Sequence, residues 1–258
     1  MTIMYTWKPI MEIRHRMDPA YWDPAYDAPM QEMQRAGWEV KTIGDVLEEN
    51  RVTSSDHVRA SRGEAIGEQF EAEYYTVGGI LSTGYDITQL MHCSDNAYER
   101  LKRTQLRDKD LIMANSGKGS VGKVCIVHEP DERACVGDLF ILRVVDVNPY
   151  WVAALLKSRY GQAQIERIEH GVSRMTHLRT EDVKSLLLPL VHQSIQSHVE
   201  ERYRHVSNFH EAAMEAKVAG NEAEYQGKLA YAEQLLNELI AYIENVIKSG
   251  PQALEAER

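Results

Sequence analysis

A long segment without proline limits the possible folds of this chain more than any other feature. Residues 193–248 contain no proline and consist mainly of residues with high helix propensity. Within this segment, apolar or small residues recur at three- and four-residue spacing, first at positions 195, 199, 206, 209, 213 and 216, with Arg202 interrupting. A helix of this length cannot bury its apolar stripe alone, so it needs a partner in the same chain or in another chain.

A second apolar series follows a heptad spacing and is out of phase with the first across Gly220-Asn221. Gly220 can end one helix while Asn221 and Glu224 cap a second one. The alternative at this position is a stutter within one long helix. The second series consists of Tyr225, Leu229, Ala232, Leu236, Leu239, Ile243 and Val246. We predict that Tyr225, Leu229, Leu236, Leu239 and Ile243 form a dimer or partner-helix seam. A helical hairpin folding back on its own domain is the alternative.

The first 190 residues have the pattern of a mixed domain. Apolar, β-branched runs at 111–114, 124–127 and 138–145 predict strands. Asn148-Pro149 predicts a helix start, with a helix to about residue 158 and another near 160–168. We therefore expect an α+β chain: a globular α/β domain at 1–190 with a twisted, mainly antiparallel sheet, a long helical coiled-coil arm at 191–248, and a flexible tail at 249–258.

Composition restricts the cellular context. The three cysteines, Cys93, Cys125 and Cys135, form no CxxC pair, which favours free thiols in a reducing compartment. No apolar run approaches the roughly 18 to 20 residues of a membrane span, and the N-terminus lacks the apolar core of a signal peptide. We expect a cytoplasmic protein without a membrane partner.

The distribution of charge is more informative than its sum. The chain has a formal net charge of −10, yet residues 100–190 contain 15 Lys and Arg against 11 Asp and Glu. A basic middle between acidic flanks is compatible with a localised anionic partner. Chance clustering on a solvated surface is the alternative on charge alone.

Two short motifs suggest activities that their context argues against. Gly117, Gly122 and Lys123 have the spacing of a phosphate-binding P-loop, but Val124 replaces the required Ser or Thr and a strand follows instead of a helix. The stretch Asn148-Pro149-Tyr150-Trp151 is similar to an adenine-methyltransferase motif but lacks its second proline, and a helix cap explains it better. No HExxH motif, nucleophile elbow or helical i, i+4 histidine pair is present.

The order of features resembles the specificity subunit of type I restriction–modification systems. The family's short lead-in is similar to residues 16–22, its opening strand and turn to 38–47, and its helices to 161–165 and 192–201. The family's glycine-containing hairpin is similar to LRDKDLIMANSGKGSVGKVCIV (106–127), and a later family segment is similar to GVSRMTHLRTEDVKSLLLPL (171–190). Lys109 occupies a position where the family usually has glycine. No single motif is specific, but the same order extends over about 230 residues. The match is weakest at 50–100.

The family usually has two recognition domains and two long helices, and this chain has room for one of each. The resemblance therefore implies a half-subunit that pairs with itself or with a second half-subunit. A symmetric dimer would read a bipartite, palindromic target. It also implies double-stranded DNA, an adenine methyltransferase subunit and, optionally, a restriction/translocase subunit as partners. The chain itself would be non-catalytic and without a cofactor, because the methyltransferase would bind S-adenosylmethionine.

The candidate DNA-binding residues lie in three polar groups and a variable tract. Backbone amides of a glycine-rich loop together with Lys and Arg side chains suit phosphates, and polar side chains suit base edges. The predicted set is Arg100, Lys102, Arg103, Asn115, Ser116, Lys118, Ser120, Lys123, Arg174, Thr176, His177 and Tyr85, with Tyr74, Tyr75, Ser82 and Thr83 as further base-reading candidates. About six phosphate contacts would lower affinity about 10³-fold between 50 and 200 mM salt. A coiled-coil adaptor or anti-restriction protein that binds proteins instead of DNA is the alternative function.

Overall fold

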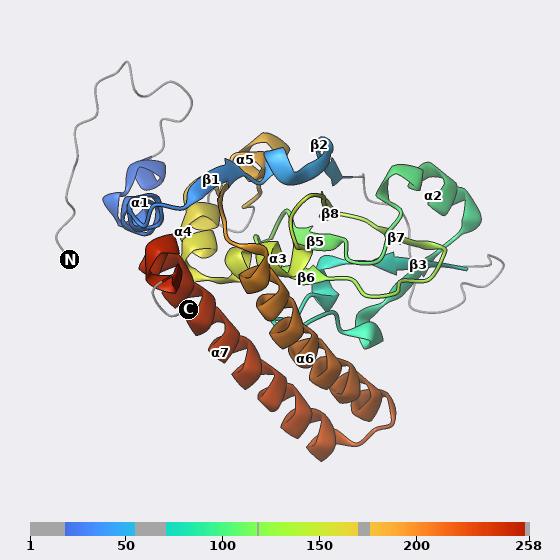
Figure 1. The fold of residues 1–258 in the computed structure, drawn as a ribbon. Helices are drawn as coiled ribbons and strands as arrows, with labels where there is room; N and C mark the ends of the chain where they lie inside the picture. Colours follow the sequence, from blue (N-terminus) through green and yellow to red (C-terminus); the bar gives the residue numbers. More distant parts are fainter. Residues whose placement is uncertain (1–18, 55–70, 118, 170–175, 256–258) are drawn as a thin grey trace.

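The computed structural model describes residues 19–54, 71–117, 119–169 and 176–255 (Figure 1). Lys118 and Arg174 of the predicted set lie outside these residues, as do residues 16–18 of the lead-in. In the described part, strands form three sheets, and a long helical hairpin follows them. The predicted fold class, a mixed α/β domain with mainly antiparallel sheets followed by long C-terminal helices, is confirmed.

A four-stranded antiparallel sheet forms the centre of the domain, in the order β2-β8-β5-β6. Its strands are β2 (Leu47–Ser54), β8 (Leu139–Val144), β5 (Leu111–Ala114) and β6 (Val124–Ile126). A three-stranded sheet contains β4 (Met91–Cys93), β3 (Ala72–Tyr75) and β7 (Ala134–Val136), and β3–β7 is its one parallel pair. The antiparallel pair β1 (Glu39–Thr42) and β9 (Leu187–Leu190) joins the two ends of the domain sequence.

Five helices pack around the sheets of the described residues, and the last two, α6 and α7, form a long antiparallel pair that extends from the domain (Figure 1). They are α1 (Asp27–Arg35), α2 (Asp95–Arg100), α3 (Pro149–Lys157), α4 (Arg159–Ile168), α5 (Thr180–Lys184), α6 (Gln193–Val218) and α7 (Glu222–Glu255). Short 3-10 turns lie at Pro19–Trp22, Pro24–Tyr26, Gly44–Val46, Val77–Gly79, Ile87–Gln89 and Lys102–Thr104. The predicted cap is confirmed, because the Asn148 side chain accepts a hydrogen bond from the Tyr150 amide at 2.9 Å.

Gly220-Asn221 forms a turn between two antiparallel helices. Gly220 has a φ of 75°, a left-handed conformation that ends α6, and the Asn221 side chain accepts from the Glu224 amide at 3.3 Å. The alternative of a stutter is therefore wrong. Helix α7 has a break at Gly250 and then continues, so residues 251–255 of the expected flexible tail have a helical backbone.

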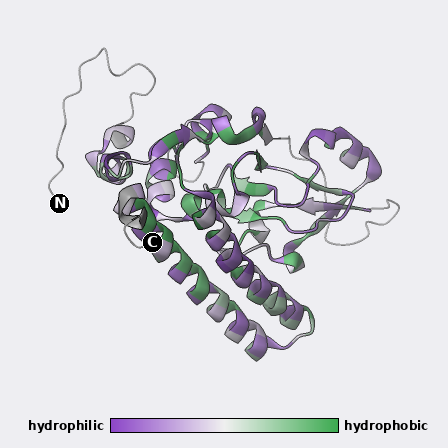
Figure 2. Cartoon of the chain, viewed as in Figure 1, coloured by the Kyte–Doolittle hydropathy of each residue, from purple (hydrophilic) through white to green (hydrophobic). Residues whose placement is uncertain are grey.

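The apolar seam of α7 is buried within the chain itself. Leu236, Leu239 and Ile243 are 3% or less exposed and belong to the same core as Trp151 of α3 and Val199 of α6. Both helices are amphipathic along their length (Figure 2). Burial of these three side chains therefore needs no second chain. Tyr225 and Leu229, near the hairpin turn, are half-buried. A boundary at residue 190 separates two kinds of structure but not two cores.

Candidate nucleic-acid interface

The predicted loop at residues 115–123 connects two paired strands, as expected. Strand β5 pairs with β6 in antiparallel register, with Leu111 opposite Ile126 and Met113 opposite Val124. The glycines of the loop, Gly117, Gly119 and Gly122, have φ values of 98°, 75° and 77°, which other residues rarely adopt. Since a strand follows the loop, a P-loop is excluded here on structural grounds as well.

Most amides of this loop donate hydrogen bonds within the chain. Ser120 and Val121 donate to Gly117 O at 3.0 Å each, Gly122 to Ala114 O at 2.9 Å, and Lys123 to Ser120 O at 3.0 Å. These four N–H groups are not available to a phosphate without breaking the turn. The prediction that the loop main chain binds phosphate is therefore wrong for these positions, and a phosphate contact here would need side chains.

A second polar segment pairs with the start of this loop. The Gly117 amide donates to Thr176 O at 3.0 Å, and the Leu178 amide donates to Asn115 O at 2.8 Å. Ser116 and His177 lie directly opposite each other in an antiparallel bridge, and both are exposed. Opposed side chains of this kind have Cβ atoms about 4.5 to 5.5 Å apart. The predicted residues Asn115 and Ser116 are thus brought together with Thr176 and His177, which follow 61 positions later in the sequence.

We call this region the two-loop surface and define it by Asn115, Ser116, Ser120, Lys123, Thr176 and His177. Ser116, Lys123 and His177 are exposed, whereas Asn115, Ser120 and Thr176 are half-buried. The Thr176 hydroxyl is buried without a hydrogen-bond partner among the described residues. The surface offers hydroxyl, amide, imidazole and ammonium groups, the donor and acceptor types that read base edges and bind phosphates.

The basic cluster at Arg100, Lys102 and Arg103 lies elsewhere. It precedes β5, whereas the two-loop surface follows β5, so the two groups lie at opposite ends of this strand. The five-residue path from Asp110 to Asn115 is about 17 Å long. Lys102 forms an ion pair with Glu99, and Arg100 and Arg103 are exposed. The structure does not combine this cluster with the loop in one compact site.

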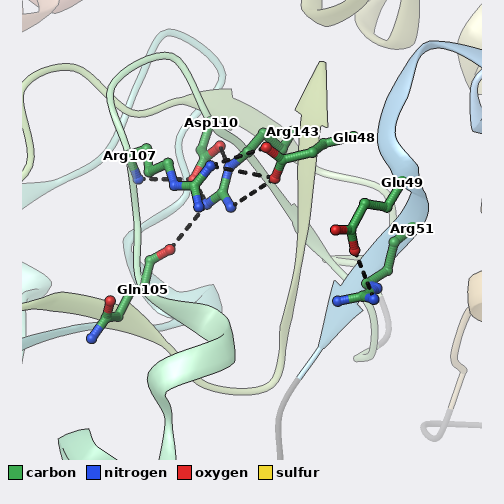
Figure 3. A network of polar contacts seen from close by, with 7 residues as sticks. All are labelled: Glu48, Glu49, Arg51, Gln105, Arg107, Asp110 and Arg143. Carbon is green, nitrogen blue, oxygen red and sulfur yellow. Dashed lines mark hydrogen bonds and ion pairs between the residues drawn. The ribbon is translucent and has the colours of Figure 1, made fainter. Parts of the chain in front are cut away.

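A network of ion pairs fixes the turn between this cluster and β5 (Figure 3). Asp110, 1% exposed, accepts from the Arg107 amide at 2.8 Å and from Arg143 Nε and Nη2 at 2.8 and 2.6 Å. Arg143 Nη2 also donates to Gln105 O at 3.1 Å. Glu48 binds both arginine side chains, and its pKa is lowered chiefly by the hydrogen bond from Arg143. The network thus connects the turn to β8 and β2 and pairs the exposed Arg107 with a carboxylate.

The tyrosines of the variable tract are core residues. Tyr85 is 7% exposed, its ring contacts that of Tyr75, and its hydroxyl accepts from the Thr76 amide at 2.9 Å. Tyr74 and Thr83 are also buried. The prediction of Tyr85 as a DNA contact is therefore corrected, and the same holds for Tyr74, Tyr75 and Thr83. Ser82 is the exposed member of that group.

A cavity of about 470 Å³ lies between the loop, α4 and α7, and the sequence patterns did not predict it. Its apolar walls include Val121, Ile165, Leu236 and Ile240. Two lysines and two glutamates also line it: Lys123, Lys157, Glu166 and Glu169. Lys157 had one sequence signal, since it is the single charged residue of the apolar helix Pro149–Lys157.

The described residues contain no cluster of three or more His, Cys, Asp or Glu with the arrangement of a metal site. Within the same residues, no helix is long and apolar enough to span a membrane.

Comparisons with known proteins are limited to structure. No protein-family model and no curated protein matches the chain. A type I restriction–modification S subunit from M. genitalium is similar with 18% identity and a TM-score of 0.45, over 70% of this chain and 41% of that one. A chain from a type I R-M system studied for complex assembly has 15% identity and a TM-score of 0.45, over 85% of this chain and 52% of that one.

The HsdS subunit from Thermoanaerobacter tengcongensis has 14% identity and a TM-score of 0.41, over 84% of this chain and 51% of that one. The chain thus spans about half the length of the structures it matches.

Proposed function

We propose that this chain recognises a sequence in double-stranded DNA as the specificity half-subunit of a type I restriction–modification system. The observation on which this depends most is the backbone pairing of residues 115–117 with 176–178. It places Ser116 and His177 side by side on an exposed edge that also includes Lys123. The ordered resemblance of sequence features supports the choice of family.

The two sequence segments that contribute the two-loop surface have the charge that a DNA contact needs. Residues 115–123 contain two lysines and residues 174–179 contain two arginines, with no Asp or Glu in either segment. Side-chain cations bind phosphates, and the hydroxyl of Ser116 and the imidazole of His177 are suited to base edges. Recognition would therefore combine phosphate contacts with reading by side chains from two segments.

The proposal assigns methyl transfer and cleavage to partner subunits, and none to this chain. One domain would read one half of a bipartite target, so two copies, or two different half-subunits, would act together. Their contact would have to use surface other than Leu236, Leu239 and Ile243, which are buried in the hairpin. Tyr231 on α7, 44% exposed, is such a surface residue. Sedimentation of the purified chain and of Tyr231→Glu tests this pairing: a dimer weakened by the substitution supports it.

Binding to a randomised duplex library, with and without an adenine methyltransferase subunit, tests the function. We expect enrichment of one short sequence. Ser116→Ala and His177→Ala should relax preference at particular base pairs, with each lost contact worth about 1–3 kcal/mol. Lys123→Ala should weaken binding to all sequences alike and reduce the salt slope by about 1. Lys228→Ala, on the far part of the hairpin, is the matched control and should change neither.

One observation favours the adaptor alternative. The cations before β5 are largely balanced by Glu48 and Glu99, and the chain as a whole has a net charge of −10. An acidic protein that binds the methyltransferase but no duplex in the library experiment would establish this alternative and exclude DNA recognition.

A further inference from the structure

Lys157 has an environment different from that of an ordinary surface lysine. It ends α3, an otherwise apolar helix, and its half-buried side chain lines the 470 Å³ cavity. Its Nζ donates to Ser82 O at 2.7 Å and also to Val124 O. The lysine therefore connects the 81–84 segment to the first residue of β6.

The two carbonyls accept two hydrogens of Nζ in either protonation state. A neutral amine has two N–H groups and one lone pair, whereas an ammonium has three N–H groups and no lone pair. Two acceptors bind Nζ in the described part of the chain, so both hydrogens of the neutral form are used. In the neutral form the lone pair is therefore the group of Nζ that remains for a cavity occupant, whereas in the charged form a third N–H remains. Burial lowers the pKa of Lys157 to about 8, which makes this neutral form accessible near neutral pH.

We propose that Lys157 is an acylation site, at which its amine takes a short-chain acyl group from an activated donor, an acyl phosphate or an acyl thioester. Nζ attacks the carbonyl carbon, an N–C amide bond forms and the C–O or C–S bond to the leaving group breaks. The displaced proton leaves with the phosphate or thiolate. Because the step exchanges one acyl bond for another, no oxidant or reductant is involved.

The cavity has the chemistry that such a donor requires. Its volume is within the range of about 300 to 1,000 Å³ typical of small-molecule sites. Val121, Ile165, Leu236 and Ile240 offer apolar walls to an acyl chain. Besides Lys157, the charged groups of the lining are Lys123, which offers a cation to an anionic leaving group, and the carboxylates Glu166 and Glu169 of α4. The resulting amide nitrogen has one hydrogen, so either Ser82 O or Val124 O would lose its donor. Acylation would thus loosen the connection between the 81–84 segment and β6, whether or not the chain binds DNA.

Acetylation kinetics of the purified full chain test the proposal. The chain is treated with acetyl phosphate in one arm and acetyl-CoA in the other, from pH 6.5 to 9.5, and site occupancy is measured by peptide mass spectrometry. Lys123 is the matched control, because it lines the same cavity but is exposed. At pH 7.5 roughly a quarter of an amine with a pKa of about 8 is neutral, against about one in a thousand for a free lysine.

We expect Lys157 to react at least ~10-fold faster than Lys123 at pH 7.5 in one or both arms, since its lower basicity and confinement offset part of the advantage in neutral fraction. Its rate should level off above about pH 8, while that of Lys123 continues to rise. In urea the two rates should become equal. A native Lys157 rate no greater than that of Lys123 in both arms would overturn the proposal.

A cavity-filling variant tests the route. Val121→Phe should slow acetylation of Lys157 at least ~5-fold while leaving Lys123 unchanged, because residue 121 is in the cavity wall and only half-buried. If circular dichroism shows that this variant is unfolded, Ile240→Phe on α7 replaces it. An undiminished Lys157 rate in a folded variant contradicts attack from the cavity.

Discussion

Replacing Asp110 with alanine removes the buried carboxylate at the centre of the network in Figure 3. In the native chain this group accepts two bonds from the Arg143 side chain and one from the Arg107 amide. Asp110 is 1% exposed and the Arg143 side chain 20% exposed, so water can replace these bonds only in part. The substitution leaves a largely buried guanidinium without its carboxylate.

The expected loss follows from this geometry. Removing one partner of a buried ion pair costs about 3–5 kcal/mol, because the other charge stays uncompensated. The partial exposure of Arg143 places this site at the lower end, about 3 kcal/mol, or roughly two powers of ten in the folding equilibrium. Urea unfolding followed by circular dichroism measures the change as a shift in midpoint at constant slope.

Two further variants make this prediction specific. Glu48→Ala removes the exposed arm of the same network and should produce a much smaller loss. The double variant Asp110→Ala, Arg143→Met should be more stable than Asp110→Ala alone, because it leaves no unpaired charge. The reasoning is refuted if Asp110→Ala destabilises no more than Glu48→Ala, or if the second substitution gives no recovery.

Three other expectations concern backbone conformation and pH. Lys109 has a φ of 66°, so Lys109→Gly should raise the free energy of unfolding by about 0.5–1 kcal/mol and Lys109→Ala should not. A Cβ on Gly122 would lie 2.4 Å from Ile165 Cγ2, so Gly122→Ala should destabilise by about 2–3 kcal/mol, more than Gly119→Ala, which has a similar φ but open space. Burial lowers the pKa of His210, so the unfolded chain binds more protons below about pH 6.5. The contribution of neutral His210 to the free energy of unfolding should therefore be fully present above this pH and be lost as pH falls towards the folded pKa. In urea titrations at several pH values, His210→Asn should flatten that decline.

Local patterns predicted the features that depend on neighbouring residues. The glycines and β-branched runs around residues 111–127 predicted a hairpin, Asn148-Pro149 predicted a helix start, and Gly220-Asn221 was compatible with the turn that the structure contains. In each case the hydrogen bond or backbone conformation that decides the structure involves residues only a few positions apart, so the local sequence is enough to predict it.

Features that depend on distant contacts were missed or misplaced. The pairing of Ser116 with His177 and the burial of Tyr85 depend on chain segments 61 and 125 residues away, the latter through His210, which binds Tyr85 O at 2.9 Å. Similarly, no local pattern shows that Lys157 reaches the carbonyl of Ser82. The partner of the α7 seam was open for the same reason, because a heptad pattern specifies an apolar stripe but not the surface that covers it.

The separation of the predicted cations by β5 leads to a distinct expectation for DNA binding. Residues 95–110 contain five Lys and Arg against four Asp and Glu, and Glu48 adds a carboxylate through Arg107, so that end has almost no net charge. The loop segments 115–123 and 174–179 contain four cations and no carboxylate. We therefore expect three to four phosphate contacts instead of six, and a fall in affinity of about 40- to 150-fold between 50 and 200 mM salt instead of about 10³-fold. Under this expectation Arg100→Ala with Arg103→Ala leaves the logarithmic salt slope unchanged. A decrease of about 1.8 in that slope would show instead that the duplex contacts both ends of the strand.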